Sequence, residues 1–99
     1  MRYEVWHRQA PTFGENNPRL LQLDFPKGFV LVAVVDVADE HAVFTVTNHV
    51  QHAWTTNPEV VELPRGVGQR STSVGDVIVE QDTLRAWTVD RIGLTQFEG

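Results

Sequence analysis

A dense group of polar side chains, Arg70, Ser71, Ser73 and Asp76, lies in the stretch "RSTSVGD" just before an apolar run. A guanidinium can hold a carboxylate or a phosphate with two parallel hydrogen bonds, and serine hydroxyls can add further bonds. The group could therefore recognise an anionic partner. The same residue types also build turns, because serines bond to loop backbone groups and an arginine pairs with a nearby acid. We favour the structural role and keep all four as candidate binding residues.

A tryptophan in a polar loop is the second candidate. Trp54 and Asn57 lie in the loop 51–58. A loop tryptophan either closes the edge of a core or anchors a protein interface, and both roles stay open here. Trp6 and Trp87 belong to alternating segments, so we expect them to pack in the core or on a sheet face. Trp54 and Asn57 are the predicted binding residues of this loop.

A histidine pair could hold a metal ion. His49 and His52 are three residues apart, which would place them on one face of a helix, and Glu40 or Asp36 could complete a site. The chain has no cysteine to assist. A solvent-facing or helix-capping role is favoured, since histidine suits the negative end of a helix. We therefore predict neither a metal site nor a cofactor.

Signatures of catalysis are missing from the sequence. It contains no nucleophile elbow, no phosphate-binding glycine loop and no metalloprotease spacing. Serines and histidines occur, but an enzyme needs a nucleophile, a base and an oxyanion site within mutual reach. An enzymatic role is disfavoured for this reason.

Size and charge narrow the remaining classes. The 99 residues are enough for one domain with one core, and 41% of them are hydrophobic. The net charge is -5 and the eight basic residues are spread along the chain, which disfavours binding to a nucleic-acid backbone. The longest apolar run, residues 29–35, is too short to span a bilayer. With no signal peptide in the sequence, we expect a soluble, cytoplasmic protein without a membrane partner.

Hydrophobic patterning predicts a sheet with one helix. Alternating or continuous β-branched residues indicate strands, which are expected at 2–7, 28–37, 59–63, 76–80, 85–90 and 93–97. Four residues separate the segments 76–80 and 85–90, which predicts an antiparallel hairpin. A long irregular connection, rich in proline and glycine, is expected at 9–28. The first strand is a candidate edge for pairing with a second copy, so a homodimer is possible.

One segment, residues 36–50, fits two structures. Asp36 could cap a helix whose first turn carries Asp39 and Glu40, while "AVFTVT" is typical of a strand. We favour the helix. The predicted fold is α+β: a small, mostly antiparallel sheet of four to five strands with one helix packed on it, in a single domain covering residues 1–99. A small, partly open β-barrel is the alternative.

The carboxy-terminal half resembles a known family. "RSTSVGDVIV" followed by "WTVDRIGL" is similar to the signature of the YodL-like family of small bacterial proteins, which are often encoded on plasmids, phages and conjugative elements. The likeness covers residues 45–97. Leu94 stands where that family usually has Phe, and the turn "QDTL" lacks its usual Gly. The resemblance implies a mobile-element setting and no general catalytic reaction.

These observations favour a non-catalytic accessory protein of unknown molecular function that binds another protein. Its expected surface is formed by the loops 51–58 and 64–73, with Trp54 and Arg70 as anchors. A small-barrel protein that binds a nucleic acid or nucleotide through Arg70, Arg85 and Arg91 is the alternative, and a small enzyme of unknown reaction is a further one. The sequence does not identify the partner.

Overall fold

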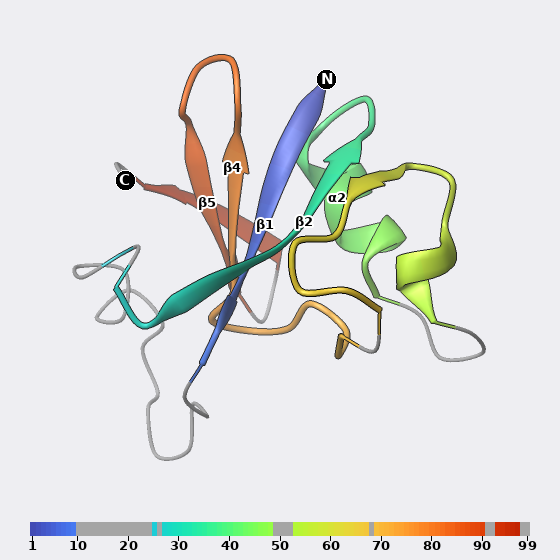
Figure 1. The fold of residues 1–99 in the computed structure, drawn as a ribbon. Coiled ribbons are helices and arrows are strands. Elements are labelled where there is room, and N and C mark those ends of the chain that lie inside the picture. Colours follow the sequence, from blue (N-terminus) through green and yellow to red (C-terminus); the bar gives the residue numbers. More distant parts are fainter. Residues whose placement is uncertain (10–24, 26, 49–52, 68, 91–92, 98–99) are drawn as a thin grey trace.

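The fold is a single antiparallel sheet with one α-helix, as a computed structural model describes it for residues 1–9, 25, 27–48, 53–67, 69–90 and 93–97. Six strands are hydrogen-bonded in the order β3-β2-β1-β4-β5-β6. Their bounds are β1 Arg2–Arg8, β2 Phe29–Asp36, β3 Val60–Glu62, β4 Val77–Glu80, β5 Ala86–Asp90 and β6 Gly93–Phe97. The helices are α2, Glu40–Val46, and a 3-10 turn, η1, Trp54–Thr56 (Figure 1).

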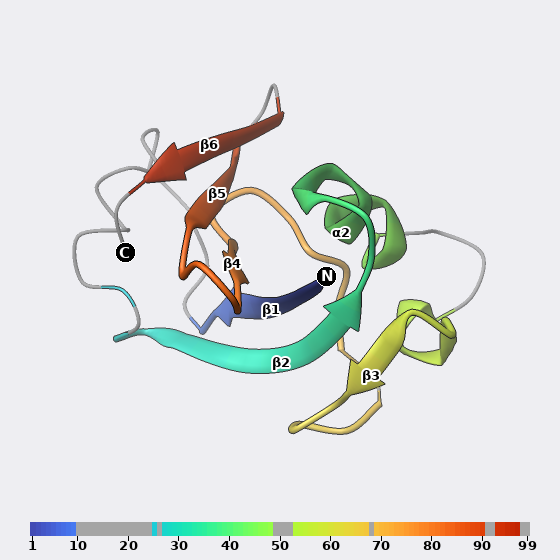
Figure 2. The same ribbon diagram turned by 90° about the horizontal axis from the view of Figure 1, so that it is seen from above.

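The sheet is curved but open, and the helix lies on its concave side (Figure 2). Every strand pairs antiparallel with its neighbours, which confirms the α+β class with a mostly antiparallel sheet and one helix. The expected four to five strands were too few, because each short segment at 60–62 and 93–97 also pairs. A closed barrel is not formed, since β3 and β6 are separate edges of the sheet.

The first strand corrects one expectation. β1 lies between β2 and β4, with which it pairs along most of its length, so it is not an edge. Its alternate side chains Tyr3, Val5 and His7 are all buried. Period-two patterning reveals that one face is buried, but it does not reveal where a strand lies in the sheet. The edges available for pairing with a second copy are therefore those of β3 and β6.

Within the ambiguous segment, residues Glu40–Val46 form a helix, as favoured, but with a different cap. The Asp39 carboxylate accepts a hydrogen bond from the Ala42 amide at 2.9 Å, which satisfies an amide that the first turn leaves without a helical partner. Asp36, the expected cap, is instead the last residue of β2. There its Oδ1 atom lies 3.0 Å from the amino group of Met1. The helix begins three residues later than a cap at Asp36 would place it, because Asp36 still belongs to the strand.

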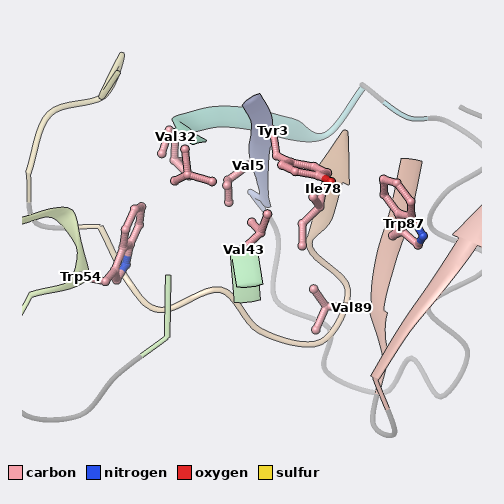
Figure 3. Packing of buried hydrophobic residues seen from close by; sticks show 10 residues of the cluster. Tyr3, Val5, Val32, Val43, Trp54, Ile78, Trp87 and Val89 are labelled. Atoms are coloured by element: carbon pink, nitrogen blue, oxygen red, sulfur yellow. The ribbon is translucent and has the colours of Figure 1, made fainter. Parts of the chain in front are cut away.

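The main core lies between the concave face of the sheet and α2. Val43 of the helix is fully buried against side chains of β1, β4 and β5, including Val5, Ile78 and Val89 (Figure 3). Phe44 and Val46 pack partly against the same cluster. A smaller cluster on the other face contains four buried residues: Phe29, Val77, Val79 and Ala86. A seven-residue helix is too short to be stable alone, so this packing holds it.

The carboxy-terminal hairpins agree with the prediction. β4 pairs with β5 across the turn "QDTL", which is closed by hydrogen bonds from the Glu80 amide to the Arg85 carbonyl and from the Leu84 amide to the Glu80 carbonyl. Leu84 has a φ of 62°, a left-handed conformation that glycine adopts without strain. The backbone at Leu84 is therefore strained, and its side chain is exposed.

Two expectations concern residues outside the described part of the chain. Most of the connection 9–28 lies there, and so do both members of the histidine pair, His49 and His52. Among the described residues, no helix has the length and apolar character needed to cross a membrane.

Candidate functional site

The polar signature folds around one buried carboxylate. Asp76, just before β4, is fully buried, and Arg70 holds it in a two-pronged ion pair. The Arg70 Nη1 atom lies 2.6 Å from Oδ2 and Nη2 lies 2.8 Å from Oδ1. These hydrogen bonds to Asp76 raise the pKa of Arg70, which is a cation in any case. Burial of the acid makes the pairing necessary, because an isolated carboxylate would be costly there.

Two backbone amides complete the coordination of this carboxylate. The Arg8 amide donates to Oδ1 at 2.9 Å and the Ser73 amide donates to Oδ2 at 2.8 Å. Arg70 adds bonds from Nη1 to the Ser71 carbonyl and to the Ser73 hydroxyl, both at 3.0 Å. Asp76 therefore fastens the loop 70–76 to the end of β1. We call His7, Arg70, Ser73 and Asp76 the Asp76 cluster.

A buried histidine completes the Asp76 cluster. His7 Nε2 lies 3.0 Å from the Thr72 hydroxyl and 3.8 Å from Asp76 Oδ2. The pKa of His7 is lowered to about 4, chiefly by burial; the Asp76 carboxylate opposes this shift, and the Arg70 cation adds to it. Arg70 already balances the Asp76 charge, so His7 is neutral at pH 7. Since His7 and Thr72 are both buried, neither the His7 ring nitrogen nor the Thr72 hydroxyl is accessible to a substrate from solution.

The two candidates of the loop 51–58 also make internal contacts. Trp54 is 2% exposed, packs in the main core and donates from its indole nitrogen to the Arg70 carbonyl at 2.8 Å. Asn57 donates from Nδ2 to the Val46 carbonyl, also at 2.8 Å, at the end of α2. Of the two roles open to Trp54, closing the core is the one its side chain has in this structure. Its predicted contact with a partner stays a prediction.

A cleft of about 500 Å³ opens between α2 and the β5–β6 hairpin. Figure 2 shows α2 inside the curve of the sheet, beside the end formed by β5 and β6. The lining is mostly apolar, and it comes from the helix, the loop before β4 and the last two strands: His41, Phe44, Thr45, Asn48, Ser73, Val74, Val89, Asp90, Gly93 and Leu94. A volume of this size with a few polar groups is typical of a binding site.

The signature and the cleft are joined by one loop. Ser73 belongs to the Asp76 cluster through its amide and hydroxyl, and it also lines the cleft, as does its neighbour Val74. Val74 is 38% exposed. The Asp76 cluster thus holds one wall of the cleft in place. Of the predicted binding residues, Ser73 alone is among those that line it.

Sequence reasoning missed the other wall of the cleft. Phe44 comes from α2, whereas Val89 and Leu94 are cross-strand partners in the β5–β6 hairpin, far from α2 along the chain. None of the three was predicted as a binding residue, because an apolar residue on a helix or strand gives no sign of whether its outer edge stays uncovered. The structure alone shows that this face of the helix is incompletely covered, since Val43 is the one buried residue of α2.

The cleft is separate from the buried titratable residues of the Asp76 cluster. His7 and Asp76 do not line the cleft, and both are buried. His41, which does line it, has an exposed ring whose nearest acid is Glu40 at 3.9 Å. In the described part of the chain, no group of three or more His, Asp or Glu side chains could hold a metal ion. The cleft can take up an apolar group and offer hydrogen bonds at its rim.

Comparison with models of known protein families, with curated proteins and with solved structures gave no significant match.

Proposed function

We propose that the chain is a non-catalytic accessory protein that works by binding another protein, and that the cleft between α2 and the β5–β6 hairpin receives an apolar part of that partner. The observation that carries the proposal is the cleft itself, an apolar hollow on the surface of a small fold with a well-packed core. Hollows of this kind with a polar rim are where proteins commonly bind partners.

The predicted binding residues divide into two roles under this proposal. Ser73 can touch a partner directly, and Arg70, whose side chain is 46% exposed, lies within hydrogen-bond distance of it and can reach the rim. Asp76, Trp54 and Asn57 support the same surface from beneath, through bonds to Arg70 and to the end of α2.

The setting we propose, a bacterial mobile element such as a plasmid or phage, is supported by the resemblance of residues 70–94 to the YodL-like signature. The bonds of Arg70, Ser73 and Asp76 give those signature residues a physical purpose, since they shape one turn. That purpose is compatible with many partners. The genes that neighbour this one would test the setting directly.

The alternative of a nucleic-acid binder has less support. Two of its three arginines are engaged with buried acids, Arg70 with Asp76 and Arg85 with Glu80, and Arg91 lies outside the described residues. An arginine that neutralises a protein carboxylate contributes less to a phosphate-binding surface. No described observation favours this function over protein binding.

A pair of exposed valines permits a matched test. Val74 lines the cleft and is 38% exposed, whereas Val61 lies on β3, outside the cleft lining, and is 41% exposed. The tagged chain is expressed in its native host cells and cross-linked to the proteins bound to it. The captured protein is then identified and purified. Its affinity is then measured by calorimetry for the wild type, Val74→Glu and Val61→Glu.

We expect Val74→Glu to weaken binding roughly tenfold or more, because a carboxylate would be buried against apolar groups. Val61→Glu should bind as the wild type does. Equal affinity of all three chains would rule out the cleft as the binding surface. Failure to capture any protein, together with salt-sensitive binding of an oligonucleotide at low ionic strength, would favour the alternative instead.

A further inference from the structure

The two edges of the sheet differ in how well they are protected. β3 has only three residues, ends in Glu62, and is flanked by Pro58 and Pro64. Short length, charge and proline are the usual means by which an edge strand avoids pairing with another chain. β6 has five residues, "GLTQF", with neither charge nor proline among them. The edge of β6 is therefore the one on which a further strand can add.

The outward-facing backbone groups of β6 follow from the pairing of β5. The Val89 amide donates to the Asp76 carbonyl and the Val89 carbonyl accepts from Gly75, so Val89 faces β4. In an antiparallel ladder alternate residues face opposite neighbours, and Thr88 therefore faces β6. Its partner Thr95 faces back toward β5. The amides and carbonyls of Leu94 and Gln96 consequently point away from the sheet.

These outward groups have no partner among the described residues. β6 is hydrogen-bonded to β5 alone in the strand order, and no bond from the Leu94 or Gln96 backbone reaches another described segment. Leu94 and Gln96 together offer two outward amides and two outward carbonyls along the edge of β6. That arrangement is complementary to an identical strand that runs in the opposite direction.

We propose that a second copy of this chain pairs with β6 across a two-fold axis at Thr95, joining the two sheets into one. Leu94 of each copy then lies opposite Gln96 of the other, and each such pair exchanges two backbone hydrogen bonds. Thr95 faces Thr95 of the second copy at the axis, a favourable cross-strand pair. Since β6 carries no charge, the net charge of -5 on each chain places no like charges opposite one another in this register.

The proposed dimer would also extend the cleft. Leu94 lines the cleft and packs against the main core, so its side chain is on the concave face of the sheet. Side chains directly opposite on paired strands share a face. Gln96 of the second copy would therefore stand beside Leu94 at the margin of the cleft. The dimer depends on the free edge of β6 among the described residues and not on the function proposed above.

The test uses a proline that removes one outward amide. The Gln96 amide points away from β5, so Gln96→Pro keeps the hydrogen bonds within the chain and deletes one donor from each copy of the dimer. Gln96→Val is the matched control, because it changes the side chain and keeps the amide. Sedimentation equilibrium of all three chains, from micromolar to millimolar concentration, measures the association constant, and circular dichroism verifies the fold.

We expect the wild type and Gln96→Val to form dimers as concentration rises, and Gln96→Pro to associate roughly 30-fold more weakly or not at all, since two hydrogen bonds are lost. Hydrogen exchange gives a second measurement. The Leu94 and Gln96 amides should gain protection with concentration, whereas the Thr95 amide should be protected throughout. A wild type that stays monomeric at millimolar concentration, or a Gln96→Pro variant that dimerises equally well, would overturn the proposal.

Discussion

The two ends of β4 each carry a buried acid paired with an exposed arginine, yet the two pairs do different work. At the start of the strand, Asp76 binds Arg70, and at its end Glu80 binds Arg85 at 2.9 Å. Both acids are 1% exposed or less, while their arginines are 46% and 52% exposed. Each pair joins a buried carboxylate to a half-exposed arginine at one end of β4. The two acids differ in how far along the chain their hydrogen-bond partners lie.

Asp76 joins distant segments, whereas Glu80 acts mainly within one turn. The Arg8 amide that binds Asp76 is 68 residues away, and Arg70 also reaches the Arg8 carbonyl at 3.3 Å. Glu80 instead binds mainly within its own hairpin, to the Thr83 hydroxyl at 2.8 Å and to Arg85 at 2.9 Å, while Tyr3 of β1 makes the weakest of the interactions that lower its pKa. The Thr83 hydrogen bond, followed by Arg85, lowers the pKa of Glu80. A buried ion pair thus supports the tertiary structure or a local turn according to its partners.

The largest effect is expected from Asp76→Asn. Both carboxylate oxygens accept from Arg70 and from a backbone amide, and an asparagine Nδ2 would meet two of those donors with a donor of its own. The free energy of unfolding should fall by about 3–5 kcal/mol, the usual result of removing one partner of a buried pair. Urea denaturation measures it. A loss no larger than that of Glu80→Gln would contradict the distinction between the two ends.

Acid should destabilise the end of β4 that holds His7. The pKa of His7 is about 4 in the folded chain and near 6.5 when unfolded, so the unfolded chain binds more protons between these values. Stability should therefore decline as the pH falls from 6.5 to 4, by roughly 3 kcal/mol.

Unfolding curves recorded across that pH range measure this decline, and His7→Gln serves as the control. The variant should be less stable at pH 7, because it alters a buried side chain, and it should lack most of the slope between pH 6.5 and 4. An identical slope in both chains would show that other groups cause the acid sensitivity.

A smaller and more local effect is expected from Glu80→Gln. The variant keeps an acceptor for Thr83 but loses the charge that holds Arg85, so the melting temperature should fall less than in Asp76→Asn. Hydrogen exchange should quicken at the turn amides, such as Leu84, and stay unchanged in β1. Faster exchange in β1 would mean that this pair also holds distant segments together.

The smallest effect, and a stabilising one, is expected from Leu84→Gly in the same turn. A left-handed φ strains a leucine by about 1 kcal/mol and a glycine hardly at all, although glycine also adds freedom to the unfolded chain. The exposed leucine side chain loses little packing. The net gain should be about 0.5 kcal/mol, and Leu84→Ala, which keeps the strain, is the matched control in thermal unfolding.

The sequence-based predictions succeeded where a local pattern carries the information. Alternation identified β1, β4 and β5, and "QDTL" identified the hairpin between the last two. The favoured structural role of the polar signature agrees with the bonds that Arg70 and Asp76 make. The cap of α2 was placed at Asp36 rather than Asp39, because nothing local shows where a buried strand stops and a helix begins.

The cleft and the position of β1 required the tertiary structure. The cleft walls are Phe44 of α2, Val74 of the loop and Leu94 of β6, and their distance apart depends on how a short helix sits on a curved sheet. β1 was expected at an edge, yet β2 and β4 pair on both sides of it.

By itself, then, the sequence determined the class of fold, the strands and the turn built by Arg70 and Asp76, because each depends on residues close together in the chain. Strand order, the burial of Trp54, the neutral state of His7 and the open edge of β6 were decided only when distant segments met. The physical reason is that the burial of a side chain and the charges near it depend on all the residues around it. For each of these residues, those neighbours come from several elements.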